Sequence, residues 1–459
     1  MKAMLSAPAL AALKALLAEN DLLVGSEAQF YACDESRALA PAASAVAFPR
    51  THEQVVDIIQ WANMFGVGLV PSGGRTGLSG GACAGSGELV LSLMRMNRLL
   101  AFDEVAGIVT VQAGMVLETL QQQVAECGWF YPVDYASKGS AQIGGAVATN
   151  AGGIRVLRYG MTRDWVAGIK AVCGNGETLE LQRNLVKDNG GYDLKQLLIG
   201  SEGTLAVVTE VSLRLTQPMP AQTTVLIGVK NLHELVDIFA RLRKNWQLSA
   251  AEFFCANALA RVCAAHQFTP PFSNFHAFYL LVELDEAETD LPLLAELLAD
   301  SAVLVSQHAS QAHQWWQLRE LISSTLNPFI PYKNDIACQP RELAPWLQAL
   351  AAGFAEVDHQ VECVWFGHLG DGNVHLNVMK PPAMPAEAFD ALAGRFDRVV
   401  ADITRRFPAT ASAEHGIGTL KIGLLSSCRS PLEMAMYRQI KRVFDPNLVL
   451  NPGKIWCGE

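Results

Sequence analysis

The chain has 459 residues, of which 50% are hydrophobic and 17% are charged, so it is too long for one hydrophobic core and too apolar to be disordered. Its formal net charge of -10 has the wrong sign for a protein that must neutralise nucleic-acid phosphates. We therefore expect two or three globular domains and no nucleic-acid partner.

The cysteines are scattered along the chain. There are 10 of them, and none forms a CxxC motif that could bind zinc or an iron–sulfur cluster. Isolated cysteines of this kind are typical of small buried side chains in a reducing compartment. No run of about 18 uncharged apolar residues occurs that could span a membrane. We expect a cytoplasmic protein without a membrane span.

The first half of the sequence predicts helices and strands in alternation, which indicates an α/β arrangement. Thr51 to Gln54 form a capping-box pattern that predicts a helix over residues 51–66, and residues 67–70 predict the next strand. Further strands and one helix are predicted at 89–94, 107–113 and 117–127 (helix), and strands rich in β-branched residues at 166–172, 176–181 and 204–215.

The second half follows a linker pattern, TQPMP, at residues 216–220. Beyond it, predicted helices at 232–243, 291–298 and 342–354 are mixed with predicted strands at 223–229 and 277–284. This pattern indicates an α+β domain with its own sheet. The tail from residue 385 is predicted to be helical, and Ser430 to Glu433 form a second capping box with proline at the first helical position.

Two glycine-rich segments could bind a ligand through their backbone. Residues 71–81 (PSGGRTGLSGG) and 140–153 (SAQIGGAVATNAGG) combine glycines with small polar residues. Successive backbone N–H groups in such loops bind anions, and the absence of side chains lets a pyrophosphate approach closely. Two such segments favour a long dinucleotide over a single phosphate, although each could also be an ordinary tight turn.

The segment 367–377 (GHLGDGNVHLN) predicts a pair of histidines on one face of a hairpin. Asp-Gly is typical of two-residue hairpin turns, and with Asp371 and Gly372 in the turn His368 pairs directly with His375. Asn377 follows on the same face. Two imidazoles placed in this way can bind one divalent metal, whereas a lone histidine is usually structural.

Other charged side chains could complete such a site. Glu414 and His415, in AEHGIG, offer a carboxylate and a base. Arg319 and Ser323 are four residues apart on a predicted helix and would share a face. Lys333 follows a short loop that contains proline. Taken alone, these residues could equally be a polar turn and solvated surface charges.

Several longer motifs resemble those of one known family. In chain order they are PSGGRTGLSGG, PVDYASKGSAQIGGAVATNAGG, RYGMTRDWV, IGSEGTL, GHLGDGNVHLN, AEHGIG and DPNLVLNPGK. Their order and spacing resemble the flavin-dependent D-2-hydroxyacid dehydrogenases of the vanillyl-alcohol-oxidase (p-cresol-methylhydroxylase) fold, over nearly the whole chain. The resemblance implies an α+β protein with three parts: an FAD-binding domain of two α+β subdomains at 1–218, a substrate-binding cap domain with the metal site at 219–384, and a C-terminal helical segment at 385–459 that packs back on the FAD domain.

The same resemblance implies how FAD is bound. The first glycine-rich loop would bind the pyrophosphate, and it contains no histidine, so we expect FAD to be held without a covalent bond. The implied FAD-binding residues are Pro71, Ser72, Gly73, Gly74, Arg75, Thr76, Gly77, Leu78, Ser79, Gly80, Asp134, Ser140, Gly145, Asn150, Gly152, Gly153, Glu202, Gly203 and Asn451.

The resemblance also implies the residues of a metal and substrate site. The ligands of one divalent metal, Zn²⁺ or else Mn²⁺ or Co²⁺, would be His368, His375 and Glu414. The base would be His415. The implied substrate-binding residues are Arg319, Ser323, Lys333 and Asn377.

The implied reaction is oxidation of D-2-hydroxyglutarate to 2-oxoglutarate. The metal lowers the pKa of the hydroxyl, His415 takes its proton, and a hydride passes from C2 to N5 of FAD. An electron-transfer flavoprotein or a quinone would then accept the electrons, because the chain has no iron–sulfur motif. We expect a homodimer.

Three alternatives remain open. A D-lactate dehydrogenase or a broad D-2-hydroxyacid dehydrogenase, acting also on D-malate, would share fold, flavin and metal, and Lys333 discriminates against it. Ether-lipid synthases share this fold and use flavin without net redox change, but the paired histidines and Arg319 with Lys333 suit a small dicarboxylate better. A flavin-bearing structural subunit is disfavoured because His368, His375, Glu414 and His415 are all present.

Overall fold

The structure is a computed structural model that describes residues 5–36 and 39–456. The chain divides into two compact units. The first unit contains the described residues up to Gly153, the segment Met161–Pro218 and the described residues from Glu414 onward. The second unit contains the segments Ile154–Gly160 and Met219–Ala413. The first unit is therefore assembled from three separate pieces of the chain.

A small sheet with both faces buried forms one part of the first unit. In sheet order its strands are β1 (Leu22–Val24), β2 (Ala45–Ala47), β4 (Leu89–Ser92) and β3 (Leu69–Ser72). β2, β3 and β4 run parallel, and parallel sheets are normally covered on both sides. Val46 and Val90 accordingly belong to one hydrophobic cluster, while Ala47 and Leu91 belong to another, to which helices α1 (Ala7–Leu16) and α2 (His52–Phe65) also contribute.

Helix α2 begins where the sequence predicts. Thr51 Oγ1 accepts a hydrogen bond from the backbone N–H of Gln54 (3.3 Å), and Gly66 ends the helix with φ 62. The expected reciprocal bond is shifted by one residue, because Gln54 Oε1 accepts from the N–H of Arg50 (2.7 Å). These caps fix the chain that leads into β3 and, after it, into the first glycine-rich loop.

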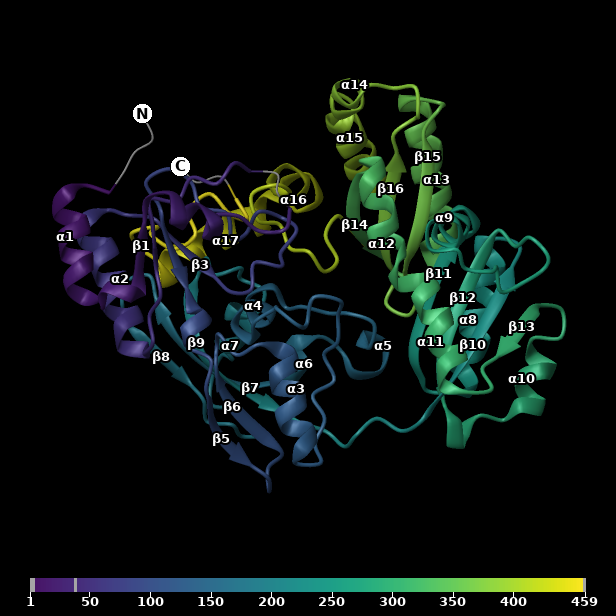
Figure 1. The fold of residues 1–459 in the computed structure, drawn as a ribbon, viewed down its shortest axis with the longest axis horizontal. Helices are drawn as coiled ribbons and strands as arrows, with labels where there is room; N and C mark the ends of the chain where they lie inside the picture. The colour runs from purple at the N-terminus through teal and green to yellow at the C-terminus, as the bar shows by residue number, and fades with distance from the viewer. Residues whose placement is uncertain (1–4, 37–38, 457–459) are drawn as a thin grey trace. The chain divides into compact units, whose positions relative to one another are not determined.

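An antiparallel sheet forms the other part of the first unit (Figure 1). In sheet order its strands are β5 (Leu99–Asp103), β6 (Ile108–Gln112), β9 (Ala206–Arg214), β7 (Val166–Cys173) and β8 (Thr178–Leu181). The helices of this part are α3 (Leu117–Glu126), α4 (Ile143–Thr149), α6 (Thr162–Trp165) and α7 (Lys195–Leu198). The predicted segments 107–113, 117–127 and 166–172 are thus confirmed as strand, helix and strand.

The second unit is built on one large antiparallel sheet. In sheet order its strands are β13 (Ala302–Val305), β10 (Gln222–Val229), β12 (Phe278–Asp285), β11 (Leu248–Cys255), β15 (Glu362–His368), β16 (Asn373–Met379), β14 (Tyr332–Cys338) and β17 (Ala409–Thr410). Its helices are α5 (Val156–Tyr159), α8 (Leu232–Asn245), α9 (Ala256–His266), α10 (Leu291–Leu297), α11 (Ala309–Glu320), α12 (Ile322–Leu326), α13 (Leu343–Val357), α14 (Ala386–Asp390) and α15 (Ala393–Thr404).

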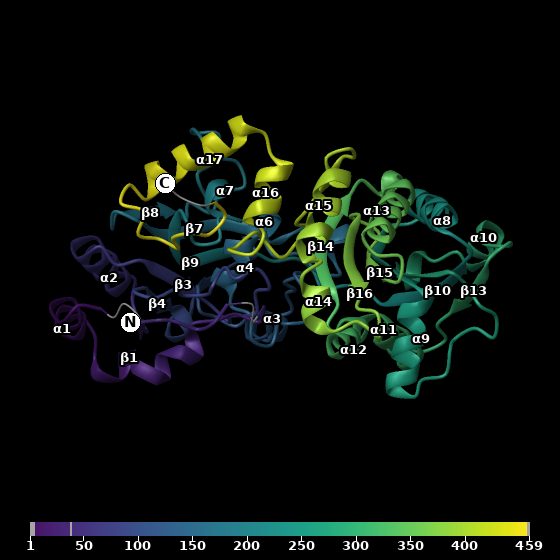
Figure 2. The same cartoon turned by 90° about the horizontal axis from the view of Figure 1, so that it is seen from above.

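Two groups of helices lie on opposite faces of this sheet. Figure 2 shows α13 and α15 on one side and α9, α11 and α12 on the other. On the α13 side, the ring of Tyr332 from β14 lies against the rings of Phe354 and Phe396. Side chains alternate along a strand, so Lys333 and Asp335 of β14 belong to the α11 side. Both α+β units agree with the expected fold class.

The end of the chain returns to the first unit. Residues 385–413, expected in the C-terminal helical segment, belong instead to the second unit, where Phe396 of α15 packs against Phe354 of α13. The helices α16 (Ile422–Cys428) and α17 (Pro431–Phe444) belong to the first unit and are drawn in yellow among its purple and blue elements (Figure 1). The predicted capping box of α17, between Ser430 and Glu433, is confirmed.

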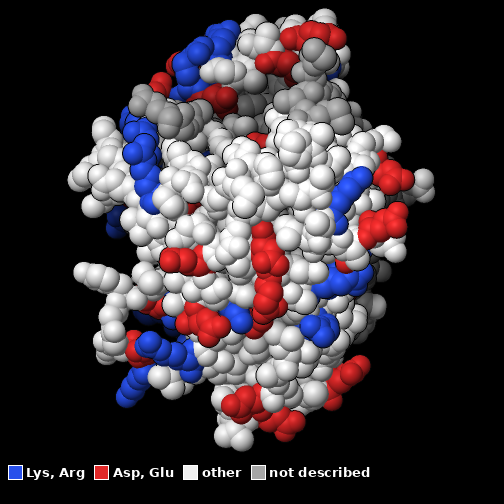
Figure 3. All heavy atoms as spheres, turned by 90° about the vertical axis from the view of Figure 1, so that its left-hand side faces the viewer, with Lys and Arg blue, Asp and Glu red and all other residues white. Residues whose placement is uncertain are grey.

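A membrane span requires a long apolar helix, and a basic binding surface requires clustered Lys and Arg side chains. None of the helices in the described part of the chain combines the length and apolar character needed to cross a bilayer. On the face drawn in Figure 3, Lys and Arg side chains are interspersed with Asp and Glu side chains and with uncharged surface. The described residues on that face therefore present no continuous basic surface.

Candidate active site

The two glycine-rich loops lie against each other in the first unit. A Cβ atom on Gly74 would stand 2.1 Å from the carbonyl oxygen of Ser140, and one on Gly73 would stand 3.7 Å from Cα of Gly145. Only glycine allows this approach at position 74. A Cβ atom on Gly145 would meet nothing within 4 Å, so open space borders the second loop there.

Side chains from outside the loops hold the first loop in place. Arg75 has φ 60, and its guanidinium donates to the carbonyl of Phe30 and stacks on the rings of Phe30 and Tyr31 at 4.5 and 4.8 Å. The guanidinium of Arg75 is thus bound within the protein, and its backbone carbonyl accepts from the N–H of Glu35 at 3.1 Å. The buried carboxylate of Asp34 accepts from the N–H of Gly80 at 2.8 Å. Asp34 has no motif around it, so sequence reasoning missed it.

Residues from distant parts of the chain join these loops. Asn451 Nδ2 donates to the carbonyls of Gly81 (2.9 Å) and Glu202 (2.7 Å). The carboxylate of Glu202 accepts from the N–H groups of Ile417 and Gly418, at 2.7 Å each. Burial raises the pKa of Glu202 in spite of these two donors. The segment after residue 414 is therefore bonded to the two glycine-rich loops and to Glu202. These loops, with Glu202 and Asn451, are called the cradle below.

Glu414 and His415 are held by this cradle through specific bonds. Glu414 Oε1 accepts from the N–H of Gly153 at 3.0 Å. The carbonyl of His415 accepts from Ser79 Oγ at 2.8 Å. The first unit therefore brings the expected third metal ligand and the expected base to the two glycine-rich loops.

Three buried polar atoms of the cradle have no partner among the described residues. They are Ser72 Oγ, Gln142 Oε1 and Asn451 Oδ1. Buried polar atoms normally form a hydrogen bond, so these three fit a polar ligand that lies along both loops. Two of the expected contact residues also bond within the protein: Asp134 pairs with Lys138 at 2.7 Å, and Asn150 Oδ1 accepts from the N–H of Arg163 at 2.9 Å.

The two predicted histidines meet on the α11 side of the second unit's sheet. His368 Nε2 and His375 Nε2 are 3.3 Å apart. The expected direct pairing is wrong: His375 pairs with Phe366, and His368 pairs with Asn373. The loop has four residues instead of two, because Gly372 N–H bonds back to the carbonyl of His368 (3.0 Å). This shifts the register by two residues and leaves both imidazoles on one face as diagonal neighbours.

A buried glutamate that sequence reasoning missed joins His368 to Arg319. Glu252 lies opposite His368 in the strand pair β11–β15 and is 1% exposed. Its Oε1 is 2.6 Å from His368 Nδ1, and its Oε2 is 2.8 Å from Arg319 Nη2. Burial alone would raise the pKa of Glu252, but His368 and Arg319 lower it overall. A lone acid in the apolar strand LSAAEFFC was the available signal, since such a charge needs a partner.

The second histidine also faces a carboxylate. His375 Nδ1 is 3.7 Å from Oδ1 of Asp335, which is fully buried and accepts from Asn373 Nδ2 at 2.7 Å. Asp371 lies near enough to feel the charges of His368 and Asp335, and burial raises its pKa. Glu252 and Asp335 thus each lie beside one imidazole of the pair, and the guanidinium of Arg319 offsets the charge of Glu252. Two adjacent imidazole nitrogens beside a carboxylate suit a divalent cation.

The structure places the expected substrate-binding residues unequally. Asn377 lies opposite Lys333 in the strand pair β16–β14, on the same face as His375. Arg319 is buried, whereas Ser323 is exposed. The expected single helix ends at Glu320, and Ser323 lies in the separate helix α12, so these two residues do not share a helix face.

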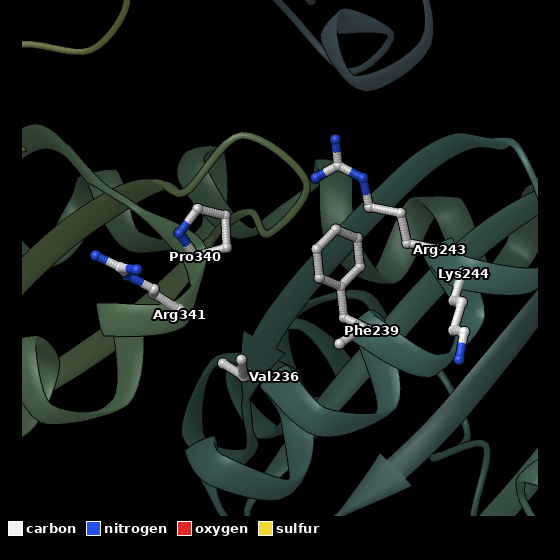
Figure 4. Close-up of a pocket in the computed structure, with 7 residues that line it drawn as sticks. Val236, Phe239, Arg243, Lys244, Pro340 and Arg341 are labelled. Carbon is white, nitrogen blue, oxygen red and sulfur yellow. The ribbon is translucent and has the colours of Figure 1, made fainter.

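A shallow hollow of the second unit belongs to the opposite side of the sheet. Its volume is about 360 Å³, and its lining residues are Val236, Phe239, Ala240, Arg243, Lys244, Pro340 and Arg341 (Figure 4). They come from α8, which packs against α13, and from the turn before α13. The hollow is therefore separate from the histidine pair.

Comparison with known proteins gives consistent matches along the chain. A family model described as FAD binding domain matches residues 43–182, and one described as FAD linked oxidases, C-terminal domain, matches residues 219–455. A D-2-hydroxyglutarate dehydrogenase of Xanthomonas citri pv. viticola is 45% identical, over 94% of this chain and 93% of the relative. One of Stutzerimonas stutzeri is 41% identical, over 97% of this chain and 98% of the relative.

Solved structures support the same fold. A p-cresol methylhydroxylase with substrate bound matches with a TM-score of 0.78 and 15% identity, over 98% of this chain and 96% of that one. An alkyldihydroxyacetonephosphate synthase matches with a TM-score of 0.75 and 17% identity, over 98% and 86%. At such identities the likeness concerns the fold alone.

Proposed function

This chain belongs to the family of FAD-linked oxidases, and from that membership we propose that it oxidises D-2-hydroxyglutarate to 2-oxoglutarate. Two relatives that are 45% and 41% identical bear the name D-2-hydroxyglutarate dehydrogenase. The observation that carries the proposal is the α11 side of the second unit's sheet. It combines two adjacent imidazoles with two separate cations, Arg319 and Lys333, as a hydroxylated dicarboxylate requires.

The first unit would hold FAD between its two glycine-rich loops. The close approach of Gly74 to Ser140, the open space at Gly145 and the unpartnered Ser72 and Asn451 oxygens fit such a ligand. It would be lined by the residues that the resemblance implies, which are residues 71–80, Asp134, Ser140, Gly145, Asn150, Gly152, Gly153, Glu202, Gly203 and Asn451. When bound, FAD accepts the hydride from C2 of the substrate at N5.

A divalent metal would be held by His368, His375 and Glu414, with Zn²⁺ as the first choice. The 3.3 Å approach of the two imidazole nitrogens, with the carboxylate of Asp335 beside His375, supports a divalent ion. Glu414 directly follows Ala413, whose N–H bonds to Asp335 Oδ2 at 3.1 Å, beside His375. A metal in this site supplies a Lewis acid that lowers the pKa of the substrate hydroxyl.

The remaining residues would bind the substrate and move its proton. Arg319, with its buried Nε lacking a partner among the described residues, would bind the C1 carboxylate. Lys333, opposite Asn377, would bind the distal carboxylate, and Ser323 would contribute a hydroxyl. His415 would take the hydroxyl proton as a general base.

The partners of this reaction are proposed from its chemistry. We expect an electron-transfer flavoprotein or a quinone as the acceptor, because the scattered cysteines offer no iron–sulfur site. We also expect a homodimer that works in the cytoplasm.

A substrate panel tests the proposed function. Purified yellow protein is assayed with a dye acceptor on D-2-hydroxyglutarate, D-malate, D-lactate and, as a control, L-2-hydroxyglutarate. We expect the highest kcat/KM on D-2-hydroxyglutarate and no turnover of the L-enantiomer. A preference for D-lactate would favour a broad D-2-hydroxyacid dehydrogenase, and no oxidation of any acid would reject the proposal.

A further inference from the structure

Glu252 contacts both the expected metal site, through His368, and the expected carboxylate site, through Arg319. We infer that Glu252 is a positioning residue whose one carboxylate fixes the direction of the His368 imidazole and of the Arg319 guanidinium together. The inference rests on the proposed function, because it concerns how that site is prepared for a metal and a substrate. It assigns no direct contact with either.

The bond to His368 determines which ring nitrogen faces outward. Glu252 Oε1 lies 2.6 Å from Nδ1, so Nδ1 carries the proton that it donates. The lone pair is then on Nε2, which points at His375 Nε2 at 3.3 Å. Carboxylates that bond the distal nitrogen of a metal-binding histidine fix its tautomer and orientation, and their loss weakens metal binding by about 10–100-fold.

The second oxygen of Glu252 forms an ion pair with Arg319, without the angle of a hydrogen bond. Oε2 lies 2.8 Å from Nη2, and the guanidinium rests on the ring of Phe366 at 4.9 Å. These two contacts leave Nε buried without a partner among the described residues. The guanidinium is thus held by one edge and by its face, and its remaining donors are available to an anion.

The alternative is that Glu252 only compensates the buried charge of Arg319. The geometry argues against it, because a carboxylate that served Arg319 alone could use both oxygens in a bidentate pair. Here each oxygen serves a different partner. Asp335 provides a natural comparison, since the structure places it beside His375 and not beside Arg319.

The test compares Glu252→Gln with Asp335→Asn in FAD-loaded protein. Zinc affinity is measured by competition with a fluorescent chelator, and KM for D-2-hydroxyglutarate is measured at saturating zinc. We expect zinc affinity to fall by about 10–100-fold in both variants. At saturating zinc, KM should stay raised by roughly tenfold or more in Glu252→Gln, since the guanidinium of Arg319 is then misplaced. In Asp335→Asn, KM should return to the wild-type value.

Two results would overturn the inference. One is wild-type zinc affinity in Glu252→Gln, and the other is full recovery of its KM at saturating zinc. If Glu252→Gln does not fold, Glu252→Asp keeps the charge but is too short to reach both partners, and retention of both properties in it would equally reject the inference. Wild-type protein that binds zinc but does not oxidise D-2-hydroxyglutarate would reject the proposed function instead, while the zinc measurement still decides the role of Glu252.

Discussion

Arg319 and Lys333 occupy different surroundings although both are expected to bind the substrate. Arg319 is 7% exposed and is fixed by Glu252 and Phe366. Lys333 is exposed, and its ammonium donates to Asn327 Oδ1. A rigid planar fork suits the carboxylate that every 2-hydroxyacid carries, whereas a flexible point charge suits a group that only some substrates possess. The two residues should therefore affect different aspects of specificity.

Lys333→Ser should impair D-2-hydroxyglutarate selectively. A charge pair lost on truncation costs ~2–5 kcal/mol, and the exposure of Lys333 puts the effect near the lower end, about 30-fold in kcat/KM. Turnover of D-lactate, which has no distal carboxylate, should change little. Arg319→Ala is the matched comparison and should damage both substrates. Steady-state kinetics on both acids decide the matter, and equal losses in Lys333→Ser would contradict the assignment.

His415→Ala should slow the chemical step while leaving flavin binding intact. The structure holds this residue through its carbonyl oxygen, which accepts from Ser79 Oγ, so the backbone contact survives the loss of the imidazole. A positioned general base contributes ~10²–10⁴-fold. Stopped-flow measurement of flavin reduction should show a loss of that order with little change in substrate affinity. Reduction within a few-fold of wild type would mean that another group takes the proton.

The residues that sequence reasoning found and missed differ in a physical way. His368, His375 and Asn377 stand in a segment whose turn signal and alternation define a face. Glu252 and Asp335 stand on other strands, β11 and β14, and only the pairing of these strands with β15 and β16 brings them to the histidines. Such contacts between distant strands cannot be read from spacing along one segment.

At the scale of elements, the Asp-Gly turn pattern predicted correctly that both histidines lie on one face of the β15–β16 hairpin. It predicted the wrong pairing of residues between the two strands. Asp371 and Gly372 do lie in the loop, and Gly372 has φ 78 as a turn glycine requires. Asp371 Oδ1, however, accepts from the N–H of Asn373 at 3.0 Å, and the loop extends back to Leu369. A register shift of two residues leaves each side chain on the same face of the sheet, so both histidines still lie on one face.

This hairpin leads to a prediction about metal removal. Both imidazoles lie in the second unit, whereas the expected FAD-binding residues lie in the first. Chelation should therefore abolish turnover and leave the flavin absorption spectrum nearly unchanged, and His375→Ala should do the same. Re-addition of Zn²⁺ should restore the chelated wild type but not the variant. Full activity of metal-free protein would contradict the metal site.

Helix α17 is attached to the cradle by one buried lysine, Lys441, which is paired with Asp445 at the end of the same helix. Lys441 Nζ donates to Asp445 Oδ2 and to the carbonyl of Thr204, at 2.5 Å each, and to the carbonyl of Leu450 at 2.7 Å. Thr204 and Leu450 are next to Gly203 and Asn451, which are expected to line FAD. Burial lowers the pKa of Lys441 in spite of Asp445. This lysine thus connects two FAD-lining segments with the helix that supports them.

Lys441→Met should weaken flavin retention as well as stability. Removing one partner of a buried ion pair is strongly destabilising, by ~3–5 kcal/mol, because the other charge is left without compensation. We expect a lower Tm and faster loss of FAD on dilution or gel filtration. Arg442→Ala, on the next and exposed residue of α17, is the control and should behave as wild type. An unchanged FAD content and Tm in Lys441→Met would reject this role.

At the scale of the whole molecule, the chain passes between the two units four times, after Gly153, Gly160, Pro218 and Ala413. The crossing at Pro218 lies in the TQPMP segment, whose composition is typical of a linker. The short segment Ile154–Gly160, which also belongs to the second unit, has no linker-like composition at either end. Its contacts with the second unit include two part-buried ion pairs, Arg155 with Glu283 and Arg158 with Asp285, that link it to strand β12.

We predict that FAD leaves the unfolded protein completely. The first glycine-rich loop contains no histidine, and the cradle holds its ligand through backbone approach and hydrogen-bonding oxygens. Acid precipitation should release all the yellow colour into the supernatant, where absorption and chromatography identify FAD. Flavin that stays with the precipitated protein would show a covalent bond and contradict the prediction.

The first unit is made of three separate segments of the chain, so it is the last of the two units to be completed during translation. A ribosome completes the second unit's segment Met219–Ala413 before it makes Glu414, His415 and Asn451. The cradle lacks the partners of Glu202 and Gly81 until that last piece has emerged. The second unit can thus fold before the first is complete, and a ligand of the two glycine-rich loops can be captured firmly only near the end of translation.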